Sequence, residues 1–73
     1  MFLSELKENQ SAVIAFSQSE TPFGRRLCDM GFRVGEKVCC VKRGFFKSPI
    51  IYSVCGSFVA LRKADADKIE VVL

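Results

Sequence analysis

The sequence predicts a mainly β fold: a small barrel of about five strands with one short α-helix at about residues 22–30 and a one-turn helix near residues 64–67. Along most of the chain, apolar residues alternate with other residues over short stretches separated by turn residues, a pattern typical of strands. One segment instead spaces its apolar residues three and four apart, as an amphipathic helix does. Five short strands joined by small turns favour a barrel, because closure removes most exposed sheet edges.

The first predicted strand follows a polar turn at residues 7–10 and runs through residues 11–16. Ala12, Ile14 and Phe16 form one face of this strand, and the other face is poor in polar residues. We therefore expect partial cover on both faces.

The short helix is predicted from its N-terminal signals and its periodicity. The hydroxyl of Thr21 can accept an unpaired N–H of the first turn, and Pro22 suits the first helical position, where no N–H is needed. Phe23, Leu27 and Met30 then form one apolar face.

Two glycines separate this helix from the next strand. Gly31 follows the last apolar residue of the helix, where glycine can adopt the left-handed conformation of a C-terminal cap, and Phe32 can pack back on Leu27. Gly35 opens a strand that begins near Glu36. We expect both glycines to serve the backbone geometry alone.

The second half of the chain is predicted to be β apart from one helical turn. The strands are expected at residues 36–42, 50–55, 58–62 and 68–72. Residues 43–49 read as a loop or broad hairpin tip, and Gly56 with Ser57 as a tight turn. Within each strand, alternation places on one shared face Val38 with Cys40, then Ile50, Tyr52 and Val54, then Ile69 with Val71.

Length and composition predict one globular domain, residues 1–73, with 49% hydrophobic and 26% charged residues. The core should be small, because a chain of this length buries only about 60% of the surface that its unfolded form exposes. The net charge of +3 is too small to demand a polyanionic partner. With no export signal and no long apolar segment, we expect a cytoplasmic protein.

The cysteines do not predict a metal centre. We expect free thiols, because the chain has too few cysteines for a disulfide scaffold. There is no Cys-x-x-Cys pair and no histidine, and adjacent residues of a strand such as Cys39 and Cys40 point to opposite faces. The other two cysteines are Cys28 and Cys55. Asp65, Asp67 and Glu70 are interpreted as a solvated face, so neither a metal nor a cofactor is expected.

Catalysis is also not predicted. Without histidine, a general base at neutral pH needs a strongly shifted group in a pocket that so short a chain cannot readily build. The phosphate-binding loop of nucleotide-binding proteins is missing from the sequence as well. We therefore do not expect an enzyme.

The candidate partner-binding residues are aromatic and basic. Phe45 and Phe46 adjoin in a predicted loop, where either an exposed ring anchors a partner or the loop covers one barrel mouth. The basic residues of the helix, the turn after it and the loop can converge on one side and steer an acidic surface, or can simply form a solvated surface. These are Arg25, Arg26, Arg33, Lys42, Arg43 and Lys47.

Several spaced motifs together resemble the ferrous iron transport protein A (FeoA) family. They are Arg26-Leu27, Met30-Gly31-Phe32, Gly35-Glu36-Lys37-Val38, Pro49-Ile50, Ala60-Leu61-Arg62 and the segment from Ala66 to Ile69 with Val71. The resemblance covers the chain from Leu3 to Val71. Val34 stands where the family usually has proline, and Glu8-Asn9 where it has a glycine; asparagine tolerates a positive φ.

The resemblance implies an SH3-like barrel and a function without catalysis. Members of the family are thought to dock on the cytoplasmic part of the membrane ferrous iron transporter, near its GTP-binding domain, and to support or regulate iron uptake. This implies a protein that is at most peripheral to the membrane and does not bind nucleic acid. The expected partner-binding residues are Arg25, Arg26, Arg33, Phe45, Phe46 and Lys47, with Gly31, Gly35 and Gly56 structural.

A second hypothesis is an SH3-like metal-responsive or nucleic-acid-associated regulator module, because similar barrels occur in iron-dependent repressors. The sequence disfavours it, since no DNA-binding helix-turn-helix is present and a net charge of +3 gives no basic stripe.

Overall fold

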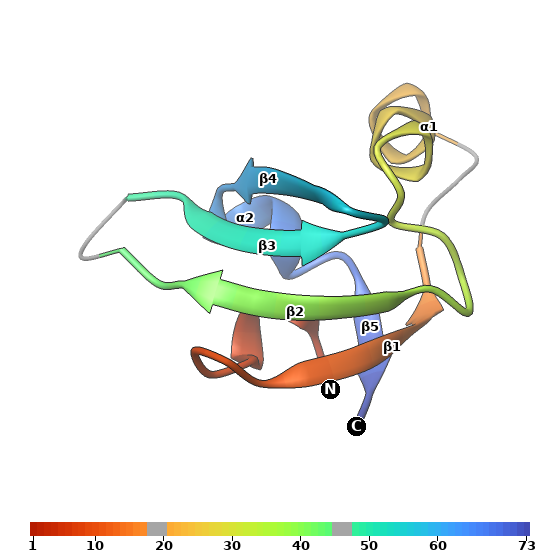
Figure 1. Ribbon diagram of the computed structural model, residues 1–73. Helices are drawn as coiled ribbons and strands as arrows, with labels where there is room; N and C mark the ends of the chain where they lie inside the picture. Colours follow the sequence, from red (N-terminus) through yellow and green to blue (C-terminus); the bar gives the residue numbers. More distant parts are fainter. Residues whose placement is uncertain (18–20, 45–47) are drawn as a thin grey trace.

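The computed structural model describes residues 1–17, 21–44 and 48–73 and confirms the mainly β fold. Figure 1 shows the elements in order. They are the 3-10 turn η1 (Leu3–Glu5), β1 (Ser11–Phe16), α1 (Pro22–Asp29), β2 (Lys37–Lys42), β3 (Ile50–Val54), β4 (Ser57–Leu61), α2 (Lys63–Ala66) and β5 (Glu70–Val72). The short helix and the one-turn helix both lie where the sequence predicts them.

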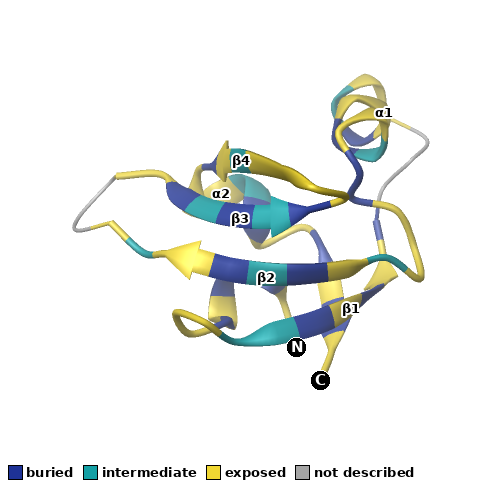
Figure 2. Cartoon of the chain, viewed as in Figure 1, coloured by how far each residue is buried: buried dark blue, intermediate teal, exposed yellow. Residues whose placement is uncertain are grey.

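The described strands form one antiparallel sheet with the order β4-β3-β2-β1-β5. The sheet wraps around the core, α1 lies at one end, and α2 carries the chain from β4 to β5 (Figure 1). Buried residues alternate along the strands in Figure 2. The core cluster is Leu3, Leu6, Ala12, Ile14, Leu27, Phe32, Val38, Cys40, Ile50, Tyr52, Val54, Leu61, Ala66, Ile69 and Val71.

The caps of α1 are those the sequence predicts. Thr21 Oγ1 accepts a 2.9 Å hydrogen bond from the Gly24 N–H, and Pro22 is the first helical residue. At the other end, Gly31 has a φ of +114°, and the N–H groups of Gly31 and Phe32 donate to the carbonyls of Cys28 and Leu27. This double hydrogen bond is a Schellman motif, which places Phe32 in the core.

The apolar face of α1 is shorter than predicted. Leu27 is buried and Phe23 packs against the core, but Met30 is the C-cap residue and its side chain is 39% exposed. The helix ends before its third turn completes, so Met30 does not turn back toward the sheet.

The prediction that Phe16 shares one face of β1 with Ala12 and Ile14 is wrong. Ala12 and Ile14 are buried, but Phe16 is 50% exposed. Val13 and Ile14 lie opposite Val72 and Val71 of β5, and a bulge then places Phe16, instead of Ala15, opposite Glu70. The extra residue reverses the inside-outside alternation, so Phe16 points outward.

The turn between β3 and β4 lies one residue earlier than predicted. Val54 pairs with Ser57, so the two loop residues are Cys55 and Gly56, with φ values of +50° and +76°. A two-residue hairpin of this kind is a type I′ turn, which requires positive φ at both positions. Cys55 therefore belongs to the turn and not to the strand.

The N-terminal segment adds structure that the sequence pattern did not predict. Phe2 forms a bridge with Glu70, and η1 buries Leu3 and Leu6 completely. In the turn that follows, Asn9 has a φ of +67°, a left-handed conformation that asparagine tolerates better than most residues do.

Replacing Gly31 tests the cap of α1. In Gly31→Ala the alanine would have to keep a positive φ, and its Cβ would lie 3.1 Å from the Cβ and Sγ of Cys55. We therefore expect a loss of about 1–3 kcal/mol in the free energy of unfolding. Gly35→Ala is the matched control, because Gly35 has a φ of +92° but open space around it. Urea denaturation should show a smaller loss for Gly35→Ala; equal losses would contradict a role for the Cys55 contact.

Candidate partner-binding surface

The described basic residues do not converge on one side. Arg25 and Arg26 are exposed on α1, and Arg33 is exposed in the turn between α1 and β2. Lys42 and Arg43 follow at the far end of β2, a strand of six residues and therefore about 20 Å long. Because β2 runs away from α1, the basic residues divide between the two ends of the sheet (Figure 1). Phe45, Phe46 and Lys47 lie outside the described residues.

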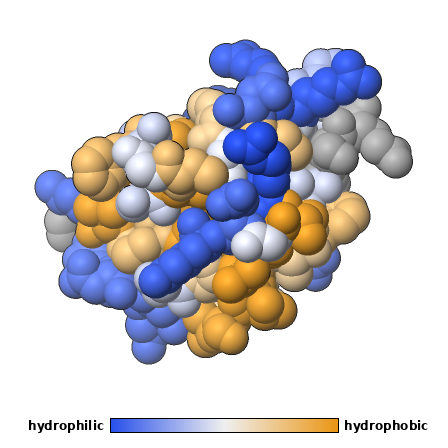
Figure 3. Space-filling model, turned by 45° about the vertical axis from the view of Figure 1, so that its right-hand side comes forward, coloured by the Kyte–Doolittle hydropathy of each residue, from blue (hydrophilic) through white to orange (hydrophobic). Residues whose placement is uncertain are grey.

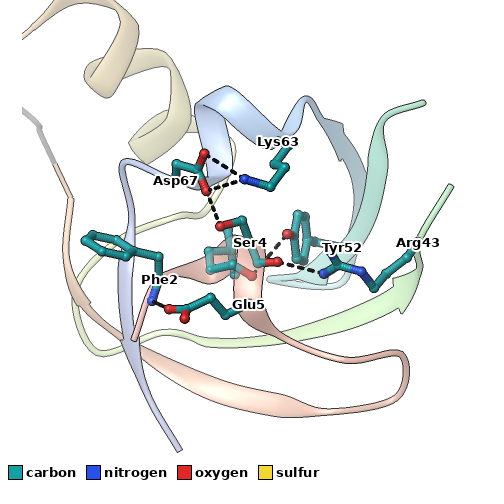
Figure 4. A network of polar contacts seen from close by, with 8 residues as sticks. Phe2, Ser4, Glu5, Arg43, Tyr52, Lys63 and Asp67 are labelled. Atoms are coloured by element: carbon teal, nitrogen blue, oxygen red, sulfur yellow. Dashed lines mark hydrogen bonds and ion pairs between the residues drawn. The ribbon is translucent and has the colours of Figure 1, made fainter. Parts of the chain in front are cut away.

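Arg43 is turned inward, against the sequence-based interpretation. Its Nη1 donates to the carbonyl of Ser4 at 2.7 Å (Figure 4) and to that of Leu6 at 2.7 Å, and so satisfies the carbonyl groups at the end of η1. The buried Tyr52 hydroxyl donates to the Leu3 carbonyl at 3.1 Å, and burial raises the pKa of Tyr52 above its ordinary value. These contacts anchor η1 to β2 and β3, so Arg43 stabilises the fold and is not part of an open basic surface.

Two of the three carboxylates predicted as a solvated face form local ion pairs. Asp67 accepts hydrogen bonds from the Ser4 hydroxyl and from Lys63 Nζ, the latter at 3.2 Å (Figure 4). Asp65 pairs with Arg62 at 3.4 Å. The hydrogen bond from Ser4, followed by that from Lys63, lowers the pKa of Asp67 below its ordinary value. Asp67 thus links α2 to η1.

The cysteines occupy separate environments. Cys39 and Cys40 point to opposite faces of β2, as predicted, and burial raises the pKa of Cys40. Cys39 and Cys55 line a shallow hollow of about 310 Å³ on the outer face of the sheet. All four thiols are free. In the described part of the chain, no three metal-ligating side chains come together.

An apolar strip on the outer face of β1 and β5 was not predicted. Val72 pairs with Val13, and Glu70 pairs with Phe16 on one side and with Phe2 on the other. Paired residues of neighbouring strands project to the same face, so these five side chains lie together. The exposed fractions are 40% for Val13, 54% for Val72, 50% for Phe16 and 44% for Phe2. We call this set, with Glu70, the β1–β5 strip.

The strip lies at the end of β1 that is close to the basic turn. The Gly35 N–H donates to the Ile14 carbonyl at 2.8 Å, which places Arg33 and the 64%-exposed Val34 beside that end of β1. Figure 3 shows hydrophobic side chains gathered at the lower centre and right of the view, with hydrophilic side chains above them and to their left. A charged and an apolar area thus adjoin on one surface.

Comparison with known families identifies the chain. The model of the FeoA domain matches residues 1–73. The chain belongs to the FeoA family. The resemblance of its motifs is thereby confirmed, and with it the association with ferrous iron transport.

Individual relatives support this family assignment. A fusion of Fe(2+) transport protein A with the Fe(2+) transporter FeoB from Porphyromonas gingivalis is 37% identical over 73 residues, all of this chain and 9% of the fusion protein. The chain thus spans less than a tenth of that relative. The zinc complex of FeoA from Stenotrophomonas maltophilia, described as a prokaryotic SH3 domain protein, is 35% identical, with a TM-score of 0.84 over 97% of this chain and 88% of that one. Iron(II) transport protein A from Clostridium thermocellum is 32% identical, with a TM-score of 0.92 over 100% of this chain and 45% of that one.

These structures confirm the SH3-like barrel that the resemblance implied. Within the described ranges, no helix has the length and apolar character needed to cross a membrane.

Because Arg43 points inward, we expect its replacement to destabilise the fold more than replacement of the exposed Arg62 does. Arg43→Met leaves the carbonyls of Ser4 and Leu6 without their charged donor, so we expect a loss of about 2 kcal/mol in the free energy of unfolding. Arg62→Met removes an exposed ion pair with Asp65 and should change stability by less than about 0.5 kcal/mol. Chemical denaturation of both variants measures the difference; similar losses would show that Arg43 does not anchor η1.

The lowered pKa of Asp67 predicts a pH dependence of stability. Because the folded pKa lies below the unfolded one, the carboxylate stabilises the fold above its ordinary pKa of 3.8, and this contribution is lost as the pH falls through the folded value. Wild type should therefore exceed Asp67→Asn in stability at neutral pH and lose that advantage below about pH 4. Asp29→Asn, at an exposed carboxylate with no hydrogen bond or ion pair to described residues, is the control. An advantage of wild type that stays constant with pH would contradict the assignment.

Proposed function

We propose that this protein is a cytoplasmic accessory or regulatory protein of ferrous iron uptake that binds the cytoplasmic part of the membrane ferrous iron transporter, at or near its GTP-binding domain. It acts by protein–protein contact and not by catalysis. The fusion relative is the observation that carries the proposal. A domain of this family and a ferrous iron transporter share one polypeptide there, and fused domains commonly correspond to separate proteins that bind each other.

The surface chemistry supports a protein partner. Exposed aromatic and arginine side chains are over-represented in interfaces, and this chain carries both at one end of the barrel. Arg25, Arg26 and Arg33 form the basic part of the proposed contact. We extend the contact to Phe45, Phe46 and Lys47, which lie outside the described residues. Long guanidinium groups around an apolar area favour association with an acidic surface and raise its rate.

The proposal predicts a charge-dependent complex. The full chain should bind the purified full-length transporter of the same organism in lipid nanodiscs, and cells lacking this protein should take up ferrous iron more slowly. A variant with Arg25, Arg26 and Arg33 changed to glutamate should bind at least about tenfold more weakly, with a smaller dependence on salt. Calorimetry in the GDP and GTP-analogue states measures both quantities.

The matched control reverses the same number of charges at the other end of the molecule. In Lys7→Glu, Lys42→Glu and Arg62→Glu combined, three exposed basic residues change while Arg25, Arg26 and Arg33 are kept. This variant should bind more tightly than the variant that lacks those three arginines. If wild type does not bind the transporter in either nucleotide state and uptake is normal without it, the proposed function is wrong.

A further inference from the structure

The β1–β5 strip suggests where the partner docks. We propose that this strip binds the cytoplasmic part of the transporter, through a segment that presents apolar side chains and places a lysine or arginine over Glu70, between the rings of Phe2 and Phe16. This inference rests on the proposed function and adds to it a surface and the chemistry of its ligand.

The backbone of β1 turns an aromatic side chain outward at this place. With regular alternation, Ala15 would face solvent and Phe16 the core; after the bulge that follows Ile14, both Ala15 and Phe16 are exposed. A bulge redirects a side chain at the expense of local pairing, and bulges are frequent next to binding sites. An aromatic ring left half in water forfeits the free energy that burial would contribute, so its outward placement suits contact with a partner.

The charge of Glu70 defines the chemistry of the ligand. Its carboxylate makes no ion pair or side-chain hydrogen bond with the residues that the structure describes, whereas its neighbours Asp65 and Asp67 both do. Glu70 lies between Phe16 on β1 and Phe2 on its other side, in one row across the sheet. A cation above this row gains an ion pair with the carboxylate and contact with two ring faces. Apolar contacts with Val13 and Val72 then fit the side chains that flank the cation.

The position of the chain ends favours the transporter as the occupant. The Val71 N–H donates to the Met1 carbonyl at 2.7 Å, and the Met1 amino group donates to the Val71 carbonyl at 3.2 Å, so both ends of the domain lie at the strip. In the fusion relative the transporter is joined to a domain that aligns with all of this chain. A polypeptide attached at either end leaves the barrel beside Phe2 and Val72, which gives it a high effective concentration at this surface.

The test compares four single variants of the full chain on the transporter in nanodiscs. Phe16→Ser and Glu70→Lys alter the strip. Phe58→Ser, at a 75%-exposed ring on β4, and Glu8→Lys, at an exposed carboxylate of the turn before β1, make the same changes elsewhere. We expect at least about tenfold weaker binding for the two strip variants and less than about twofold change for the two controls. Thermal unfolding checks each fold, and Glu70→Lys carries the test alone if Phe16→Ser is unstable.

Each other outcome overturns the inference in a distinguishable way. If wild type binds and both strip variants bind equally well, the contact lies elsewhere and the proposed function stands. If no form of the protein binds the transporter, the proposed function fails and the strip with it. Equal binding of wild type to empty nanodiscs would show that the strip contacts lipid. A dimer in sedimentation that Glu70→Lys dissociates, with transporter binding unchanged, would show that a second copy covers it.

Discussion

The pairing between the N-terminal segment and β5 holds much of this small domain in place. The Leu3 N–H donates to the Ile69 carbonyl at 2.7 Å, and the Val71 N–H donates to the Met1 carbonyl at the same distance. These bonds fix η1 against the open side of the sheet, where its carbonyls meet Tyr52 and Arg43. In a chain of 73 residues the core is small, so the hydrogen bonds of a buried tyrosine and an inward arginine matter more than they would in a large domain.

The same region shapes the outer surface. The pairing of β1 with β2 ends at Val13, before the bulge, so the bulge shifts only the register with β5. The sheet keeps its inner face, with Ile14 and Val71 buried, while Phe16 moves outward beside Glu70. The bulge thus places the ring of Phe16 on the surface, where regular pairing would place it inside, and leaves the core intact.

The features that local chemistry determines could be predicted from the sequence. Thr21, Pro22 and Gly31 act within one or two turns of their own helix, so the α1 caps were predicted correctly. The inner residues of β2 and β3 follow from strict alternation. The outward Phe16 and the Cys55-Gly56 turn depend on which residue of a distant strand lies opposite, and alternation within one strand carries no such information.

The candidate site was harder to predict for the same reason. Arg43 follows β2 and reads as a surface cation, yet the carbonyls it binds belong to residues nearly forty positions away. Glu70 was grouped with Asp65 and Asp67 by sequence proximity, whereas in the fold those two pair locally and Glu70 lies between two rings. The proposed function in ferrous iron transport rests on the family and not on a local pattern of residues.

The arrangement of charges around the strip gives the proposed contact a direction. Arg33 and the arginines of α1 lie beyond one end of β1, while Glu70 lies within the apolar area itself. A partner that places an acidic group against the arginines and a cation over Glu70 can satisfy both only in one orientation. The apolar side chains contribute most to affinity in such an interface, and opposite charges at two separate points determine the orientation of the partner. A small barrel can in this way recognise one face of a large membrane protein.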